Sequence, residues 1–250
     1  LKSLVMSLSE IVIYSGLNRP IDFSYFNPIS THLEIELNDR QNRLGTKSGN
    51  GAWQASLDWM VNKRLRFSGN LVFDEVVLDK SEKKLGKEHI TARSLKISNN
   101  FSNSSINKII GYVSIMQVGT STFRHGDGRN NFINRNIPIG WSFGSDCVES
   151  KIGLNIFNEK SFILSFEGGN RKNGDNSILY APYEKNNVFN FSKFPSGNIK
   201  EISFISSYIV KKINSHMELK SSFEYQIGSS ENREIIFNIS LDLFLSKKIL

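Results

Sequence analysis

The sequence is poor in the features that define many small folds and sites. It has one cysteine, Cys147, and five prolines among 250 residues. One cysteine excludes an intrachain disulfide framework. No apolar run approaches the about 20 residues that a transmembrane helix needs, which excludes helical membrane spans. A strand that crosses a bilayer shows only alternate residues to lipid, so the hydrophobic content of 39% leaves a β-barrel open.

Patterns that carry catalysis or bind metal are also missing. The four histidines, His32, His89, His125 and His216, are scattered, and none has a histidine or cysteine partner at metal-ligand spacing. Serines are so numerous that chance proximity to a histidine predicts no catalytic pair. We therefore expect no enzymatic activity, no cofactor and no metal site.

The charge balance is basic, with a formal net charge of +7 and a pI near 9.4. Such a chain suits an anionic partner, which could be nucleic acid, lipopolysaccharide phosphate or an acidic polysaccharide. Lysines and arginines are spread over turns and loops, and this dispersion argues against nucleic acid. No signal peptide is visible after Leu1, and we interpret the sequence as truncated at its N-terminus.

What the sequence does contain is an alternation with a period of two. Between His216 and Gly228 apolar residues hold the odd positions and polar residues the even ones, and the pattern returns from Glu234 to Leu245. Two such runs joined by a polar turn predict a β-hairpin. The same reasoning predicts about eleven strands in all, the others being Leu8–Tyr14, Thr31–Asn38, Trp53–Val61, Leu65–Asp74, His89–Ser98, Ser105–Val118, Val148–Ile156, Phe162–Phe166 and Ile199–Lys211.

Strand length favours a membrane barrel over a soluble sheet. The clearest alternation lasts about ten to thirteen residues, whereas soluble strands usually have about five or six. Trp53 and Trp59 share one apolar side about 20 Å apart at 3.3–3.4 Å per residue, as two aromatic girdles would. Two core tryptophans of a soluble sandwich are the alternative.

Connections of two lengths alternate along the chain. Short ones are predicted at 62–63, 99–104, 158–160 and 212–215, and long ones at 39–51, 76–88, 119–146 and 169–198. Outer-membrane barrels alternate short periplasmic turns with long extracellular loops in this way. The segment Ser15–Ser30 does not fit, because the count assigns it to the short-turn end although it is long.

The connection Gly119–Asp146 is the richest candidate for ligand recognition. It combines guanidinium donors with an aromatic ring, a mixture that binds anionic sugars. The residues that we select for polysaccharide contact are Arg124, Arg129, Arg135 and Trp141. A solvated loop without a ligand is the alternative. Polar residues on the strands are expected either to line an aqueous passage or to pair across strands and fill it.

Several short stretches at strand ends carry a family resemblance. They are Glu10–Tyr14 leading into Gly16–Pro20, then Tyr25–Pro28, Asp74-Glu75 and Ile137–Asp146. Their order and placement resemble the Wzi family of outer-membrane capsule-assembly proteins, and the resemblance spans most of the chain. The positions that match the family pattern are Glu10, Arg19, Asn27, Asp74, Pro138, Gly140, Gly144 and Asp146.

The alternation and the resemblance together predict an all-β, antiparallel, up-and-down transmembrane β-barrel in the cell outer membrane. Residues 1–250 would form one barrel domain that lacks its N-terminal strands. The resemblance implies a non-enzymatic lectin that anchors capsule or exopolysaccharide, with surface polysaccharide and outer-membrane lipid as partners. It also implies that Arg19 and Asp146 organise the polar interior and do not contact sugar. A general outer-membrane porin or solute channel is the alternative function.

Overall fold

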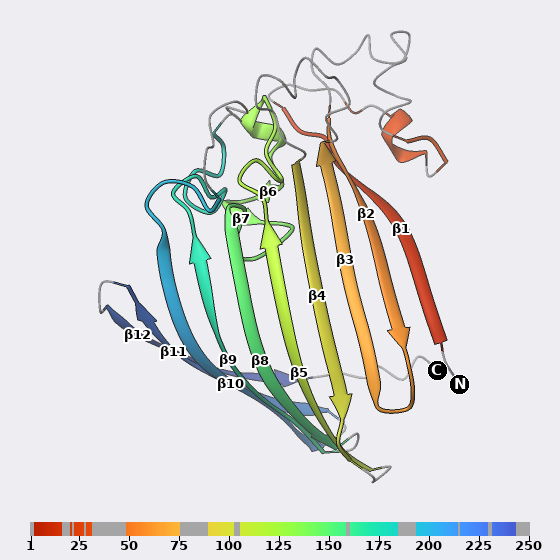
Figure 1. Cartoon of the computed structure of the whole chain (residues 1–250), viewed down its shortest axis with the longest axis vertical. Coiled ribbons are helices and arrows are strands. Elements are labelled where there is room, and N and C mark those ends of the chain that lie inside the picture. The colour runs from red at the N-terminus through yellow and green to blue at the C-terminus, as the bar shows by residue number, and fades with distance from the viewer. Residues whose placement is uncertain are drawn as a thin grey trace.

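The chain forms one large antiparallel β-sheet in the computed structural model (Figure 1). The structure describes residues 3–16, 21, 23–27, 29–31, 49–75, 90–102, 106–158, 161–184, 194–214, 216–229 and 232–243. Within these ranges the helical segments are two short 3-10 turns, η1 (Phe23–Phe26) and η3 (Gly128–Asn130). None of the described helices has the length and apolar character that a membrane crossing requires.

Ten strands follow one another across the sheet in the order of the sequence, and each pairs antiparallel with the next. They are β1 (Ser3–Ile13), β2 (Asn50–Met60), β3 (Leu65–Glu75), β4 (Ile90–Asn100), β5 (Asn107–Val118), β8 (Cys147–Asn158), β9 (Phe162–Asn173), β10 (Lys200–Asn214), β11 (Met217–Gly228) and β12 (Arg233–Leu243). The strands β6 (Ile133–Asn134) and β7 (Ile137–Pro138) form a separate small hairpin between β5 and β8. The main sheet is therefore an uninterrupted meander.

Ten of the predicted strands are confirmed, and the other, Thr31–Asn38, lies outside the described residues except for Thr31. The strand β1 pairs with β2 along its whole length, from Ser3 opposite Met60 to Ile13 opposite Asn50. The two strands are therefore neighbours in the sheet, and residues 14–49 connect them.

Short and long connections leave the sheet at opposite ends. Residues 61–64, 101–106, 159–161 and 215–216 connect strands at the end drawn lowest in Figure 1, which we call the turn end. The long connections, residues 14–49, 76–89, 119–146 and 174–199, leave the other end, the loop end, where the short turn 229–232 also lies. The predicted alternation is confirmed. The assignment of Ser15–Ser30 to the short-turn end was wrong, because β1 pairs directly with β2 and ends at the loop end.

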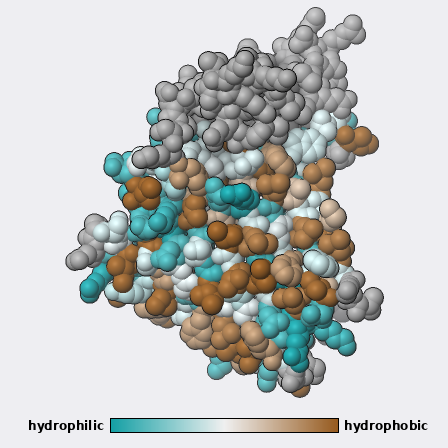
Figure 2. Space-filling view, in the orientation of Figure 1, coloured by the Kyte–Doolittle hydropathy of each residue, from teal (hydrophilic) through white to brown (hydrophobic). Residues whose placement is uncertain are grey.

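One face of the sheet is apolar. Side chains alternate along each strand, so residues in register across strands point to the same side. We call this side the apolar face, and one exposed residue from each strand in chain order is Leu8, Trp59, Leu71, Leu95, Val113, Ile152, Phe166, Ile205, Phe223 and Ile239. Hydrophobic residues cover much of the strand region on the side seen in Figure 2.

Charged residues on the apolar face stand only at its margins, among the residues that the structure describes. At the margin toward the loop end they are Glu10, Arg93, Lys172, Glu201 and Arg233, and toward the turn end there is Lys211. The residues between these margins form a continuous uncharged band across the ten strands.

This apolar band runs obliquely to the strands. Trp59 is the apolar-band residue of β2 nearest the turn end, and Ile235 is the apolar-band residue of β12 nearest the loop end. The strand pairings across the sheet place these two residues in register. A shift of about six residues over about eight strand spacings, at about 3.3 Å per residue and 4.8 Å per strand, means an inclination of about 30°. Strands in closed barrels tilt by about 35–45°.

The opposite face is polar, and we call it the loop-bearing face. Its ionic side chains pair across neighbouring strands, as Lys151 does with Glu167 at 3.0 Å and Arg171 with Glu149 at 2.9 Å. Near the loop end this face becomes apolar and packs against side chains from the connections. The core residues there are Ala52, Ala92, Val118, Phe123, Phe132, Ile133 and Ile178. The described core therefore lies between the sheet and its loops.

Candidate functional site

The connection between β5 and β8, residues 119–146, folds onto the loop-bearing face. Phe123 and Phe132 lie with ring centroids 5.2 Å apart and pack in one core cluster with Ala52 and Ala92 of the sheet. The two alanines are small, and this leaves room on the sheet for the aromatic rings. We call residues 119–146, 174–184 and 194–199 the loop layer.

Asp146 fastens the loop layer at its base. It is fully buried, and its Oδ1 accepts hydrogen bonds from Thr120 Oγ1 at 2.8 Å and from the Ser196 N–H at 2.9 Å. Its Oδ2 accepts from Ser196 Oγ at 2.5 Å. A buried carboxylate needs such donors, because burial without them is costly. The Asp146 side chain therefore joins residues 119–146 to residues 194–199 and is not exposed to a ligand.

Other family-pattern residues shape the same layer. Gly144 has a φ of +80°, a conformation that suits glycine, and a Cβ there would stand 2.6 Å from Ser177 Oγ. Gly140 lies so close to Phe123 that a Cβ would stand 2.7 Å from the ring. Asp74, near the end of β3, accepts a hydrogen bond from the Phe123 N–H at 2.6 Å. These contacts fix the path of the layer over the sheet.

The remaining family-pattern residues are dispersed. Pro138 belongs to the β6–β7 hairpin, and Glu10 stands on β1 at the margin of the apolar face. Asn27 follows η1, where its side chain accepts a hydrogen bond from the Ile29 N–H at 3.1 Å. Arg19 lies outside the described residues. The structure does not bring these positions into one site.

Arg124 is buried inside the loop layer. Its guanidinium donates to the carbonyl oxygens of Asn176 at 2.7 Å, Ala181 at 3.3 Å and Glu184 at 3.4 Å. Burial lowers the pKa of Arg124 below its usual value. The side chain holds residues 119–146 and 174–184 together, and we no longer select it for polysaccharide contact. Sequence could not separate it from the other arginines of the loop, because its burial depends on carbonyl oxygens of residues 176–184, which are distant in the sequence.

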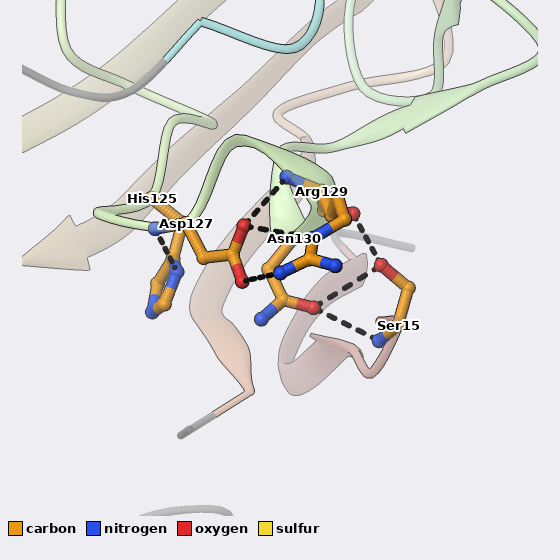
Figure 3. A network of polar contacts seen from close by, with 5 residues as sticks. All are labelled: Ser15, His125, Asp127, Arg129 and Asn130. Carbon is orange, nitrogen blue, oxygen red and sulfur yellow. Dashed lines mark hydrogen bonds and ion pairs between the residues drawn. The ribbon is translucent and has the colours of Figure 1, made fainter. Parts of the chain in front are cut away.

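Arg129 is exposed but paired within its own turn, as Figure 3 shows. The Asp127 carboxylate accepts hydrogen bonds from Arg129 Nη2 at 3.0 Å and from Arg129 Nε at 3.2 Å. This pairing raises the pKa of Arg129. Asn130 accepts a hydrogen bond from the Ser15 N–H at 2.9 Å, and Asp127 N–H donates to His125 Nδ1 at 2.9 Å. The network connects the loop layer to the chain just beyond β1.

Arg135 lies at the tip of the β6–β7 hairpin. Arg135 and Asn136 have φ values of 49° and 65°, as a two-residue type I′ turn requires. The Asn136 N–H donates to Tyr183 Oη at 3.4 Å, and the Tyr183 side chain is 49% exposed. Tyr180 is exposed as well, with the Lys200 ammonium 4.2 Å from its ring centroid. Arginine, lysine and two tyrosines therefore share the outer surface of the loop layer.

The two tyrosines were missed by sequence reasoning, which concentrated on residues 119–146. The available signal was a pair of aromatic residues in a connection rich in glycine, asparagine and serine, residues 169–198. Exposed aromatic rings in polar loops are frequent binding platforms.

Trp141 lines a cavity of about 210 Å³ between the loop layer and the sheet. The polar residues of its lining are Gln54, Asn70, Arg93 and Ser94. The apolar ones include Ile11, Ala52, Val72, Ala92, Met116, Val118, Phe123, Phe132 and Ile139. The Gln54 amide donates to Asn70 Oδ1 at 2.9 Å, and the Asn70 amide donates to Ser94 Oγ at 3.1 Å. Trp141 therefore lies apart from the exposed arginines.

No group of three histidine, cysteine, aspartate or glutamate side chains in the described ranges could hold a metal ion. In comparisons with known proteins, no family model matches the chain and no curated protein matches it.

Proposed function

We propose that this chain is part of an outer-membrane β-barrel whose loop end binds surface polysaccharide without catalysis. The observation that carries the membrane part is the uncharged apolar band, which crosses all ten strands and has charged residues only at its margins. A buried Lys or Arg at the bilayer midplane would cost about 2–4 kcal/mol, so such a band suits lipid contact.

Three further observations support a barrel in a membrane. The band is inclined to the strands by about 30°, close to the tilt of barrel strands. Short turns and long connections leave opposite ends of the sheet. A soluble sandwich would cover its apolar face with a second sheet, and the only second sheet in the described ranges is the hairpin β6–β7, whose Ile133 belongs to the core on the loop-bearing face.

The polysaccharide part depends on the loop layer and on the family resemblance. The layer exposes Arg129, Arg135, Tyr180 and Tyr183, and the Asn136 N–H next to Arg135 donates to Tyr183 Oη. Exposed guanidinium groups bind carboxylates and phosphates of acidic sugars, and aromatic rings bind the C–H faces of sugars. This combination supports attachment of an anionic polymer outside the membrane, with outer-membrane lipid around the strands.

Deletion of the complete gene from its host tests the proposal directly. The expected result is that cells still make surface polysaccharide but release it into the medium, as scored by capsule staining and by assay of the free polymer. Restoring the gene should restore the attached polymer. An unchanged capsule in the deletion strain contradicts the polysaccharide function, although the barrel proposal would survive.

A general porin is the second candidate, favoured by the polar loop-bearing face, which resembles the wall of an aqueous channel. Cross-strand ion pairs such as Lys151 with Glu167 and the folding of the loop layer onto that face count against an open passage. Steady ion conductance of the full-length protein in a planar bilayer supports the porin, whereas no conductance supports the polysaccharide-binding barrel.

A further inference from the structure

The cavity beside Trp141 is an unusual feature for its position. The loop-bearing face is polar over most of its area, as the interior of a membrane barrel is expected to be. Under the loop layer the lining is aromatic and aliphatic, with a short row of amide and hydroxyl groups from three neighbouring strands. Ile139, Gly140 and Asn70 are solvent-exposed, so the cavity is accessible from outside.

The polar row has hydrogen-bonding capacity left. Gln54 uses one amide hydrogen on Asn70, and Asn70 uses one amide hydrogen on Ser94. By their chemistry these groups retain the Gln54 carbonyl oxygen, one amide hydrogen each on Gln54 and Asn70, and the Ser94 hydroxyl hydrogen. Both donors and acceptors therefore face a ligand, as hydroxyl groups of a sugar require.

The cavity carries no charged side chain among the residues described. Arg93 contributes to its wall, but its guanidinium lies on the apolar face, where it donates to Gln117 Oε1 at 2.6 and 2.9 Å. A charged ligand group in this apolar setting would be desolvated without an ionic partner, which is costly. The lining therefore suits an uncharged ligand, in contrast to the arginines on the outer surface of the loop layer.

The size of the cavity limits the ligand. A volume of about 210 Å³ equals about seven water molecules at about 30 Å³ each, which is enough for one sugar ring. We propose that this cavity binds one uncharged sugar unit, with its C–H face against Trp141, Phe123 or Phe132 and its hydroxyl or acetamido groups on Gln54, Asn70 and Ser94. The proposal rests on the polysaccharide-binding function and assigns it a second, neutral subsite.

Tryptophan fluorescence of the full-length protein in detergent tests this subsite. Trp53 and Trp59 point to the apolar face, so Trp141 is the tryptophan that reports on the cavity. The probes are the methyl glycosides of glucose, N-acetylglucosamine and rhamnose, with glucuronic acid as the charged comparison. At least one neutral glycoside should change the emission saturably, glucuronic acid should not, and Trp141→Phe should abolish the change.

Matched variants locate the binding. Ala92→Leu fills the cavity and Asn70→Leu removes an amide from its wall, and each should weaken the neutral glycoside about tenfold, which equals about 1.4 kcal/mol. Asn155→Leu is the control, because Asn155 also bonds across strands on the loop-bearing face, to Ser165 at 2.6 Å, but lies outside the cavity. It should bind like the unchanged protein. Two independent cavity variants protect the test against a folding defect in either one.

The outcomes separate this subsite from the proposed function. Binding of the purified surface polymer without binding of any glycoside overturns the subsite and leaves the function standing. Glycoside binding that Ala92→Leu and Asn70→Leu leave unchanged overturns it as well. Failure to bind both polymer and glycosides contradicts the function and the subsite together.

Discussion

One alternation runs through the whole sheet, but burial differs between a covered half, strands β2 to β9, and an uncovered half, strands β1, β11 and β12 at or next to the edges. The covered half lies under the loop layer and supplies nearly all the buried sheet residues, from Asn50 to Asn173. Strands β1, β11 and β12 contain no buried residue, and β12 is exposed on both faces along almost all of its length. A core like that of a soluble protein stabilises the covered half, whereas the uncovered half depends on strand pairing and on its surroundings.

The largest effect is expected in the covered half, from Asp146→Ala. The change removes the acceptor of three hydrogen bonds and leaves the donors of Thr120 and Ser196 buried, a loss of about 3–9 kcal/mol at about 1–3 kcal/mol for each of the three unsatisfied donors. Asp146→Asn keeps an acceptor oxygen and should lose less. Hydrogen exchange should rise in β5 and β8 but not in β11 and β12. Equal exchange in both halves would show that the halves are one cooperative unit.

In the uncovered half the lipid-facing side should matter more than the polar side. Ile239→Arg places a charge in the apolar band and should cost about 2–4 kcal/mol of folding free energy in lipid. Asn238→Arg, on the adjacent residue of the same strand, points to the loop-bearing face and should fold normally. The measurement is the heat resistance of the folded protein on gels and its urea unfolding in vesicles. Similar losses at both positions would reverse the assignment of the faces.

A smaller effect is expected from backbone strain in the loop layer. Gly144→Ala forces a side chain into the φ of +80° and against Ser177, and we expect a loss of about 1–2 kcal/mol. Gly126→Ala is the matched control, because nothing lies within 4 Å of its added Cβ. Thermal unfolding followed by tryptophan fluorescence measures both. Equal unfolding temperatures of the two variants would show that the turn at Gly144 does not stabilise the loop layer.

The smallest effect on stability is expected from the exposed arginines. Replacing Arg129 and Arg135 by alanine should leave the unfolding temperature unchanged and reduce the polysaccharide retained by cells, since both side chains lie on the surface. Arg124→Ala should instead lower the unfolding temperature, because it removes three hydrogen bonds between two connections. Unchanged retention in the double variant would exclude the outer surface of the loop layer as the binding site for an acidic polymer.

The sheet could be predicted from the sequence because its determinant is local. Alternation such as that from Met217 to Ile227 predicts the face of the sheet on which each side chain lies. The length of a connection predicts the end of the sheet at which it lies. The direct pairing of β1 with β2 was not predicted. The segment Thr31–Asn38, which lies outside the described residues except for Thr31, was counted as a strand of the sheet, and this count assigned Ser15–Ser30 to the turn end.

The site could not be predicted to the same depth, because it depends on contacts between distant segments. Arg124 and Arg135 have the same chemistry and stand in one connection, yet one is buried by carbonyl oxygens from residues 176–184 and the other stands on a hairpin tip. The cavity likewise needs Ala52 and Ala92 of the sheet to lie opposite Phe123 and Phe132. No local sequence pattern predicts which segment packs over another.

The meander order has a consequence for the route of folding. Each strand pairs only with its neighbours in sequence, so the sheet can grow by adding one hairpin at a time to an exposed edge. The loop layer cannot form one hairpin at a time, because Asp146 accepts a hydrogen bond from Ser196, which follows β9 in the sequence. The loop layer is thus completed only after β9 is in place, and an assembly stopped at β8 would hold a sheet with unfinished loops.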